Sequence, residues 1–255
     1  MREQDLRSAV SKVPAVTLLF WVLKIFATTL GETAGDAASM SLNLGYLVST
    51  ALFAVVFALA VAAQIRASRF NPWLYWLTII ATTTVGTTIA DFVDRSLGIG
   101  YAGGSSVLLA CVLGSLFIWH RALGTVSVES VSTPRAEVFY WVTIMFSQTL
   151  GTALGDWTAD DVGLGLGYGG AAIVFGGLLT AIAALYFLTR VSRTALFWAA
   201  FVLTRPLGAV VGDFLDKPVS KGGLNLDRFA ASGALVVIMV VLLVAVRQRS
   251  ASRAH

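Results

Sequence analysis

Apolar residues fall into eight long runs along the chain, separated by short polar connections. The runs cover residues 15–36, 43–65, 72–93, 100–120, 137–158, 165–189, 194–215 and 228–246. Each is about 20 residues long, the length that an α-helix needs to cross the hydrocarbon core of a bilayer. The pattern therefore predicts an all-α membrane protein with eight transmembrane helices.

One stretch recurs in every second run, and its copies keep the same register without gaps. They are Trp21–Asp36 (WVLKIFATTLGETAGD), Trp76–Asp91 (WLTIIATTTVGTTIAD), Trp141–Asp156 (WVTIMFSQTLGTALGD) and Trp198–Asp213 (WAAFVLTRPLGAVVGD). Each copy has Gly ten residues after its Trp and Asp five residues after that Gly. The chain is therefore predicted to contain four related units of two helices each. Two spans return the chain to its starting side, so the units are parallel repeats about a pseudo-symmetry axis along the membrane normal.

The repeats and connections divide the chain as follows. We expect repeats at 15–69, 70–121, 137–193 and 194–247, a cytoplasmic connection at 122–136, and cytoplasmic segments at 1–14 and 248–255. The long connection separates two halves of two units. The sequence leaves open whether the four units surround one axis or pair into two bundles.

Composition excludes several classes of protein. The 255 residues are 57% hydrophobic and only 13% charged, which is untypical of a soluble domain. One cysteine, Cys111, and two histidines at unrelated positions provide neither a disulfide framework nor a His/Cys zinc site. The chain has no HExxH, GxSxG or P-loop motif, so we expect neither an enzyme nor a bound cofactor.

Positive charge predicts the orientation. Twelve of the 18 Lys and Arg residues lie at the termini or after even-numbered runs, whereas the connections after odd-numbered runs hold only Arg95, Lys217, Lys221 and Arg228. By the positive-inside rule, both termini are cytoplasmic. The net charge of +4 then reflects topology and contact with anionic lipid, and we expect no nucleic-acid partner.

Small residues and tryptophans of the repeated stretch predict packing. Each odd-numbered helix carries a small-xxx-small pair: Gly31/Gly35, Gly86/Ala90, Gly151/Gly155 and Gly208/Gly212. Such pairs let backbones approach closely in lipid, and we expect odd and even helices to meet along them. The four repeat tryptophans fall near the cytoplasmic interface, where an aromatic belt is typical.

A polar stripe runs back from each repeat aspartate in steps of four residues. Residues four apart lie on the same face of a helix. Its members are Lys24, Thr28, Glu32, Thr83, Thr87, Gln148, Thr152 and Arg205, together with Asp36, Asp91, Asp156 and Asp213. At about 1.5 Å per residue, Lys24 lies about 18 Å below the aspartates, near the midplane of a ~30 Å core. Ionisable groups at such depth are costly unless paired or wet, and they usually mark function.

Structural alternatives exist for these residues. The aspartates could cap helix ends at the interface, and Glu32 could pair with Lys24 or Arg205 to fix how units 1 and 4 meet. If all of them face one cavity, five carboxylates against two cations leave three net negatives, which favours a cation. Carboxylate, hydroxyl and amide oxygens suit a hard cation such as Mn²⁺, Mg²⁺ or Ca²⁺, or a proton.

The Trp–Gly–Asp repeats in two-helix units resemble a bacterial membrane family known as a tandem four-fold repeat of unknown function. The resemblance covers nearly the whole chain. It implies the eight-helix layout and the positions of Trp21, Trp76, Trp141 and Trp198, in a multi-pass protein of the bacterial inner membrane, but no substrate. The GETAGD segment of unit 1 is also similar to short acidic motifs of cation exporters, although units 2 to 4 lack the Glu.

Three functions are compatible with these features. The first is a secondary transporter, an exporter of a divalent metal such as manganese coupled to protons. Its cation and proton sites are Glu32, Asp36, Asp91, Asp156 and Asp213, with Lys24 and Arg205 competing for the carboxylates. The second is a cation channel with an outer ring of aspartates. The third is a non-transporting accessory or lipid-binding membrane protein. The sequence leaves the oligomeric state open, a homo-oligomer included.

Overall fold

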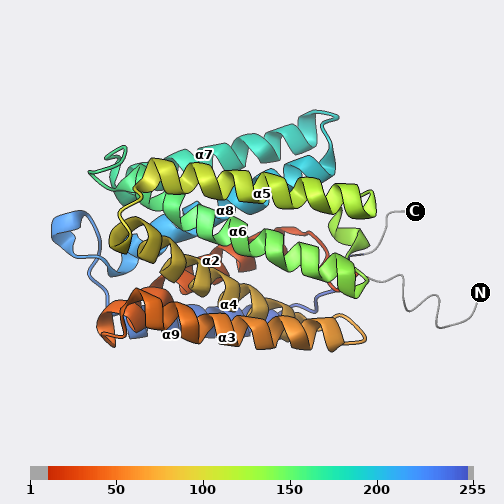
Figure 1. Cartoon of the computed structure of the whole chain (residues 1–255), viewed down its shortest axis with the longest axis horizontal. Coiled ribbons are helices and arrows are strands. Elements are labelled where there is room, and N and C mark those ends of the chain that lie inside the picture. Colours follow the sequence, from red (N-terminus) through yellow and green to blue (C-terminus); the bar gives the residue numbers. More distant parts are fainter. Residues whose placement is uncertain (1–10, 252–255) are drawn as a thin grey trace, which may run out of the picture.

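The protein is a bundle of long helices (Figure 1). The computed structural model describes residues 11–251. Its α-helices are α2 (Leu18–Asp36), α3 (Gly45–Arg66), α4 (Pro72–Asp91), α5 (Tyr101–Leu123), α6 (Pro134–Ala159), α7 (Gly167–Leu188), α8 (Arg193–Asp216) and α9 (Arg228–Ala245). Their bounds differ from the predicted runs by at most three residues. The predicted terminal segments 1–14 and 248–255 lie partly outside the described residues.

Local sequence explains where the helices begin and end. The Asn71 side chain accepts hydrogen bonds from the first turn of α4, and Thr133 does the same for α6; a proline follows each cap. Capping side chains and proline at the first position are typical helix starts. At the other end, π-helical turns at Ala37–Ser41 (η1) and Phe92–Ser96 (η2) continue α2 and α4 beyond their aspartates.

Within residues 11–251, seven helices are long and apolar enough to cross a membrane. They are α2, α3, α4, α5, α7, α8 and α9, and they indicate a multi-pass membrane protein. The remaining helix, α6, is the least apolar by composition, since it contains Glu137, Gln148 and Asp156 within its 26 residues. That α6 also spans the bilayer stays a prediction.

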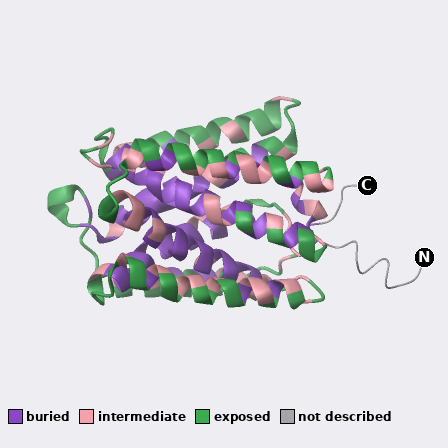
Figure 2. Cartoon of the chain, in the orientation of Figure 1, coloured by how far each residue is buried: buried purple, intermediate pink, exposed green. Residues whose placement is uncertain are grey.

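The bundle has an inner set and an outer set of helices. The inner helices α2, α4, α6 and α8 come from the repeated stretch, and α2 and α6 each pack against both α4 and α8, which closes a ring. Each outer helix covers the inner helix of the following repeat: α3 packs on α4, α5 on α6, α7 on α8, and α9 on α2. Figure 2 shows buried residues concentrated in the inner helices and exposed residues on the outer ones. The repeats are thus interlocked.

The small residues of the repeat join inner helices to one another. A Cβ added at Gly31 of α2 would lie 2.3 Å from Thr83 Oγ1 of α4, and one at Gly208 of α8 would lie 2.0 Å from Thr28 Oγ1 of α2. The equivalent glycines of α4 and α6 meet α6 and α8 in the same way. The expectation that odd and even helices meet along these faces is therefore wrong. Each of these glycines faces a side chain of the next repeat, from the position three residues before that repeat's own glycine. Only a glycine leaves space for this side chain at the helix contact.

One end of the ring is filled by aromatic side chains. Each inner helix contributes a buried ring from the position before its repeat tryptophan: Phe20, Tyr75, Tyr140 and Phe197. The Tyr75 and Tyr140 hydroxyls are 2.6 Å apart. The chain enters α2 and leaves α9 at this aromatic end, where Ala15 N donates to Arg249 O at 2.8 Å.

The repeat tryptophans lie within the bundle at the same end. Trp76, Trp141 and Trp198 are at most 5% exposed, and only Trp21 is half-buried. Trp76 Nε1 donates to Gln248 Oε1, and Trp198 Nε1 donates to the Val126 carbonyl. The predicted aromatic belt at the lipid interface is therefore wrong for these three residues, because their neighbours in the ring and the connections cover them.

Candidate functional site

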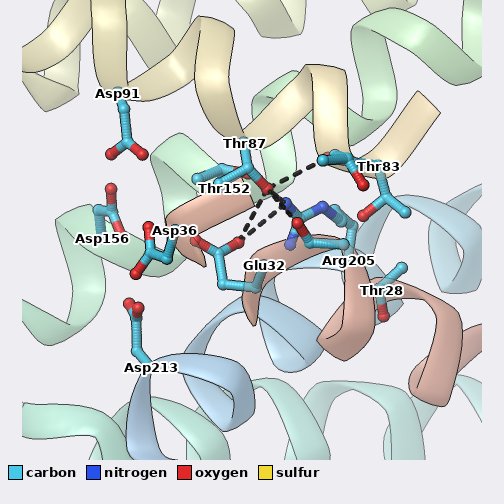
Figure 3. Close-up of polar contacts among 12 residues, drawn as sticks. Thr28, Glu32, Asp36, Thr83, Thr87, Asp91, Thr152, Asp156, Arg205 and Asp213 are labelled. Carbon is cyan, nitrogen blue, oxygen red and sulfur yellow. Dashed lines mark hydrogen bonds and ion pairs between the residues drawn. The ribbon is translucent and has the colours of Figure 1, made fainter. Parts of the chain in front are cut away.

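The polar stripes of the four inner helices face one another inside the ring (Figure 3). The parallel helices share a register, so equivalent positions form layers from the aspartate end toward the aromatic end. The layers are Asp36, Asp91, Asp156 and Asp213; then Glu32, Thr87, Thr152 and Ala209; then Thr28, Thr83, Gln148 and Arg205; then Lys24, Ile79, Ile144 and Phe201. Every one of these residues is buried. The structure therefore brings all twelve predicted site residues into the ring.

Arg205 ties the four inner helices together. Its Nη2 lies 2.9 Å from Glu32 Oε2 of α2, 2.6 Å from Thr87 Oγ1 of α4 and 2.5 Å from Thr152 Oγ1 of α6. Glu32 Oε2 also accepts a hydrogen bond from Thr87 at 3.2 Å. Of the two partners that the sequence allowed for Glu32, the structure selects Arg205, at 2.9 Å, whereas the Lys24 ammonium nitrogen lies over the Phe201 ring.

Two cations from beyond the helix ends pair with the aspartates. Arg95, in η2, lies 3.1 Å from Asp91 and 3.4 Å from Asp156. Lys217, just after α8, contacts Asp36 and lies 3.1 Å from Asp213. Each cation pairs with the aspartate of its own repeat and with that of the following repeat. The aspartates therefore form ion pairs between helices, rather than serving only as helix caps.

The Lys217 ammonium is held in its charged form. Burial lowers the pKa of Lys217, but the surrounding carboxylates, Asp213 first among them, raise it more, so that the pKa lies well above its ordinary value. The Lys217 ammonium thus lies between two carboxylates of different repeats, which favour its charged form.

A group of three carboxylates lies around Lys217. One oxygen each from Asp36, Asp213 and Asp216 lies within 4.8 Å of the others, a spacing that could hold a metal ion. Arg228 also lies 3.0 Å from Asp216. The group shares Asp36 and Asp213 with the predicted metal ligands and adds Asp216, whereas Glu32, Asp91 and Asp156 are outside it.

The charge balance differs from the one predicted from the stripe alone. With Arg95 and Lys217 included, five carboxylates face four cations, so the net charge is one negative rather than three. The sequence does carry a signal for both cations, since each follows its aspartate by four residues, one helical turn. Both cations lie beyond the apolar runs, and the stripe counted along those runs therefore does not contain them.

Several polar atoms in the middle layers have no hydrogen-bond partner within residues 11–251. They include Lys24 Nζ, Thr83 Oγ1, both amide atoms of Gln148, and Arg205 Nε and Nη1. Lys24 Nζ instead lies 3.8 Å from the centre of the Phe201 ring, in a cation–π contact.

Comparison with known proteins agrees with the repeat structure. A family model described as "Repeat of Unknown Function (DUF347)" matches four times, at residues 19–70, 74–125, 139–192 and 196–250. Each match holds one inner and one outer helix. No curated protein and no solved structure matched the chain. Because the four matches cover most of its length, the chain belongs to this family of repeats of unknown function.

Proposed function

We propose that the protein is a secondary transporter that exchanges an inorganic divalent cation for protons, with its four repeats around one pseudo-four-fold axis normal to the membrane. Glu32, Asp36, Asp91, Asp156 and Asp213 bind the cation or protons, and the stripe hydroxyls and Gln148 supply neutral oxygens. Both termini are cytoplasmic, so the aspartate end faces outward.

One observation carries this proposal: a side-chain cation, Lys217, stands among three carboxylates whose oxygens are spaced for a metal ion. Oxygen-rich groups of this kind suit hard divalent cations. The Lys217 ammonium occupies the place of the transported ion, and the incoming cation displaces it. Release of the ion lets Lys217 return, so the carboxylates are never left without a positive partner.

The aromatic end favours a carrier over a channel. Phe20, Tyr75, Tyr140 and Phe197 fill the ring there, below Ile79, Ile144 and Phe201. An ion can pass these layers only if the inner helices rearrange, whereas a channel needs a continuous polar path. The Arg205–Glu32 pair lies in the path as well.

Flux measurements in proteoliposomes test the proposal. Purified protein is reconstituted with a pH dye inside, and uptake of Mn²⁺, Mg²⁺, Ca²⁺, Zn²⁺ and K⁺ is followed. We expect one divalent cation to move against protons, with the movement lost in Glu32→Gln. Lys217→Met should lower the metal concentration for half-maximal flux, because the internal competitor is gone. Lys221→Met removes the same charge at an exposed position and serves as the control.

Two outcomes would replace the proposal. Single-channel currents would establish the channel. Absence of flux for every cation, from protein that is folded and inserted, would favour the accessory or lipid-binding protein.

A further inference from the structure

The middle of the ring holds a fully buried lysine without a counter-charge of its own. Lys24 is 0% exposed, and within the described chain its ammonium has no hydrogen-bond partner, only the face of Phe201. A buried ammonium loses its hydration, which a single aromatic ring does not replace. Lys24 therefore needs an acceptor that the inner helices do not supply.

A second cation lies about one helical turn away. Phe201 and Arg205 are four residues apart on α8, so the Lys24 nitrogen over the Phe201 ring lies about one helical turn from the guanidinium, and positive charge on both groups is repulsive unless an anion lies between them. Arg205 directs only Nη2 to Glu32, Thr87 and Thr152. Its Nε and Nη1 have no partner among residues 11–251.

The uncharged neighbours add further unused polar atoms. Gln148 is on α6 and Thr83 on α4, in the same layer as Arg205, and both are 0% exposed. Neither the Gln148 amide nor Thr83 Oγ1 has a partner in the described structure. Ammonium, guanidinium and amide together present far more N–H donors than this layer has acceptors.

These groups are complementary to an anion. The carboxylate of Glu32 pairs with Arg205 and leaves Lys24 without a counter-charge, and each unpaired buried donor destabilises the fold. We propose that Lys24, Arg205, Gln148 and Thr83 form a binding site for one small monovalent inorganic anion of halide size. Because the inner helices pack closely around these residues, only a compact ion is compatible with the site, and the buried apolar Ile79 and Ile144 lie in the next layer.

This site goes beyond the proposed function and does not depend on it. It lies two to three layers from the aspartates, and it would bind an anion, whereas the aspartates are proposed to bind a cation. An anion held there would supply the negative partner that lets Lys24 stay charged near the midplane.

Equilibrium binding of radioactive chloride tests the site. Full-length protein is purified in detergent with gluconate as the only anion, and chloride is added by dialysis at constant ionic strength. We expect saturable binding to the wild-type protein. Lys24→Met should weaken it at least about tenfold, since a charged donor is lost. Gln148→Leu keeps both cations and should weaken binding by a smaller factor.

Arg193→Met is the matched control. It removes one positive charge from an exposed position, where the guanidinium lies on the Tyr186 ring, and it should bind chloride as the wild type does. No saturable binding to the wild type, or wild-type binding by Lys24→Met, would overturn the proposal. If Lys24→Met does not fold, as judged by circular dichroism and gel filtration, Gln148→Leu decides: unchanged affinity rejects the site, and weakened affinity supports it. Cation flux is not needed for either result.

Discussion

The inner and outer helices are alike in length but differ in what their glycines touch. A Cβ added at Gly86 of α4 would lie 2.9 Å from the backbone of Gln148, whereas one at Gly114 of α5 would meet nothing within 4 Å. Outer helices instead expose large apolar side chains, such as Leu59 and Phe187. Glycine therefore allows close helix packing in the ring, whereas large apolar side chains of the outer helices are available for contact with lipid.

The polar residues differ between the two sets as well. The described outer helices contain almost no charged side chains away from their ends, whereas the inner helices bury Lys24, Glu32 and Arg205 along one axis. In lipid, a charged group is tolerated where other protein groups surround it. The buried charged side chains are thus gathered in the ring, and the outer helices separate them from lipid. Substitutions matched between the two sets can test this division.

The largest effect is expected at Glu32. Glu32→Gln leaves Arg205 buried without a charged partner, which should lower the free energy of unfolding by about 3–5 kcal/mol. Adding Arg205→Met should restore most of the loss, because a neutral pair replaces an unpaired charge. Unfolding in mixed micelles, followed by circular dichroism, measures both variants. A loss below about 1 kcal/mol in the single variant would show that the pair contributes little.

A pair of glycine variants compares the two sets directly. Gly86→Ala forces the backbones of α4 and α6 apart and should destabilise by about 1–3 kcal/mol. Gly114→Ala fills open space on α5 and should be neutral or stabilising by up to about 1 kcal/mol, because alanine favours a helix more than glycine does. The same unfolding assay gives both values. Equal effects would mean that the ring is not packed more tightly than the outer helices.

A tyrosine pair gives the smallest expected difference. Tyr75→Phe removes the hydrogen bond with Tyr140 inside the aromatic end and should destabilise by about 1–2 kcal/mol, since the remaining hydroxyl is buried. Tyr186→Phe, at a 47% exposed position on α7, should change stability by less than about 0.5 kcal/mol. If Tyr186→Phe costs as much as Tyr75→Phe, the aromatic end is open to water.

Much of the candidate site could be predicted from sequence. Stepping by four residues from each aspartate identified the twelve residues that line the ring, because every inner helix keeps the register of its repeat. Arg95 and Lys217 were not included, since they lie past the apolar runs and reach the aspartates only through the turns that follow α4 and α8. Because the predicted stripe did not contain these two cations, its predicted net charge was more negative than that of the ring.

The sequence alone determined the eight helices, the four repeats and the polar face of each inner helix, because hydropathy, caps and periodicity are local properties. Only the tertiary structure decided that the inner helices close a ring, that each outer helix covers the next repeat, and that Glu32 pairs with Arg205 rather than with Lys24. These choices depend on which side chain fits over which glycine and on how far a long cation reaches. Such contacts join residues far apart in the chain, such as Glu32 and Arg205 at 173 positions, and no local pattern records them.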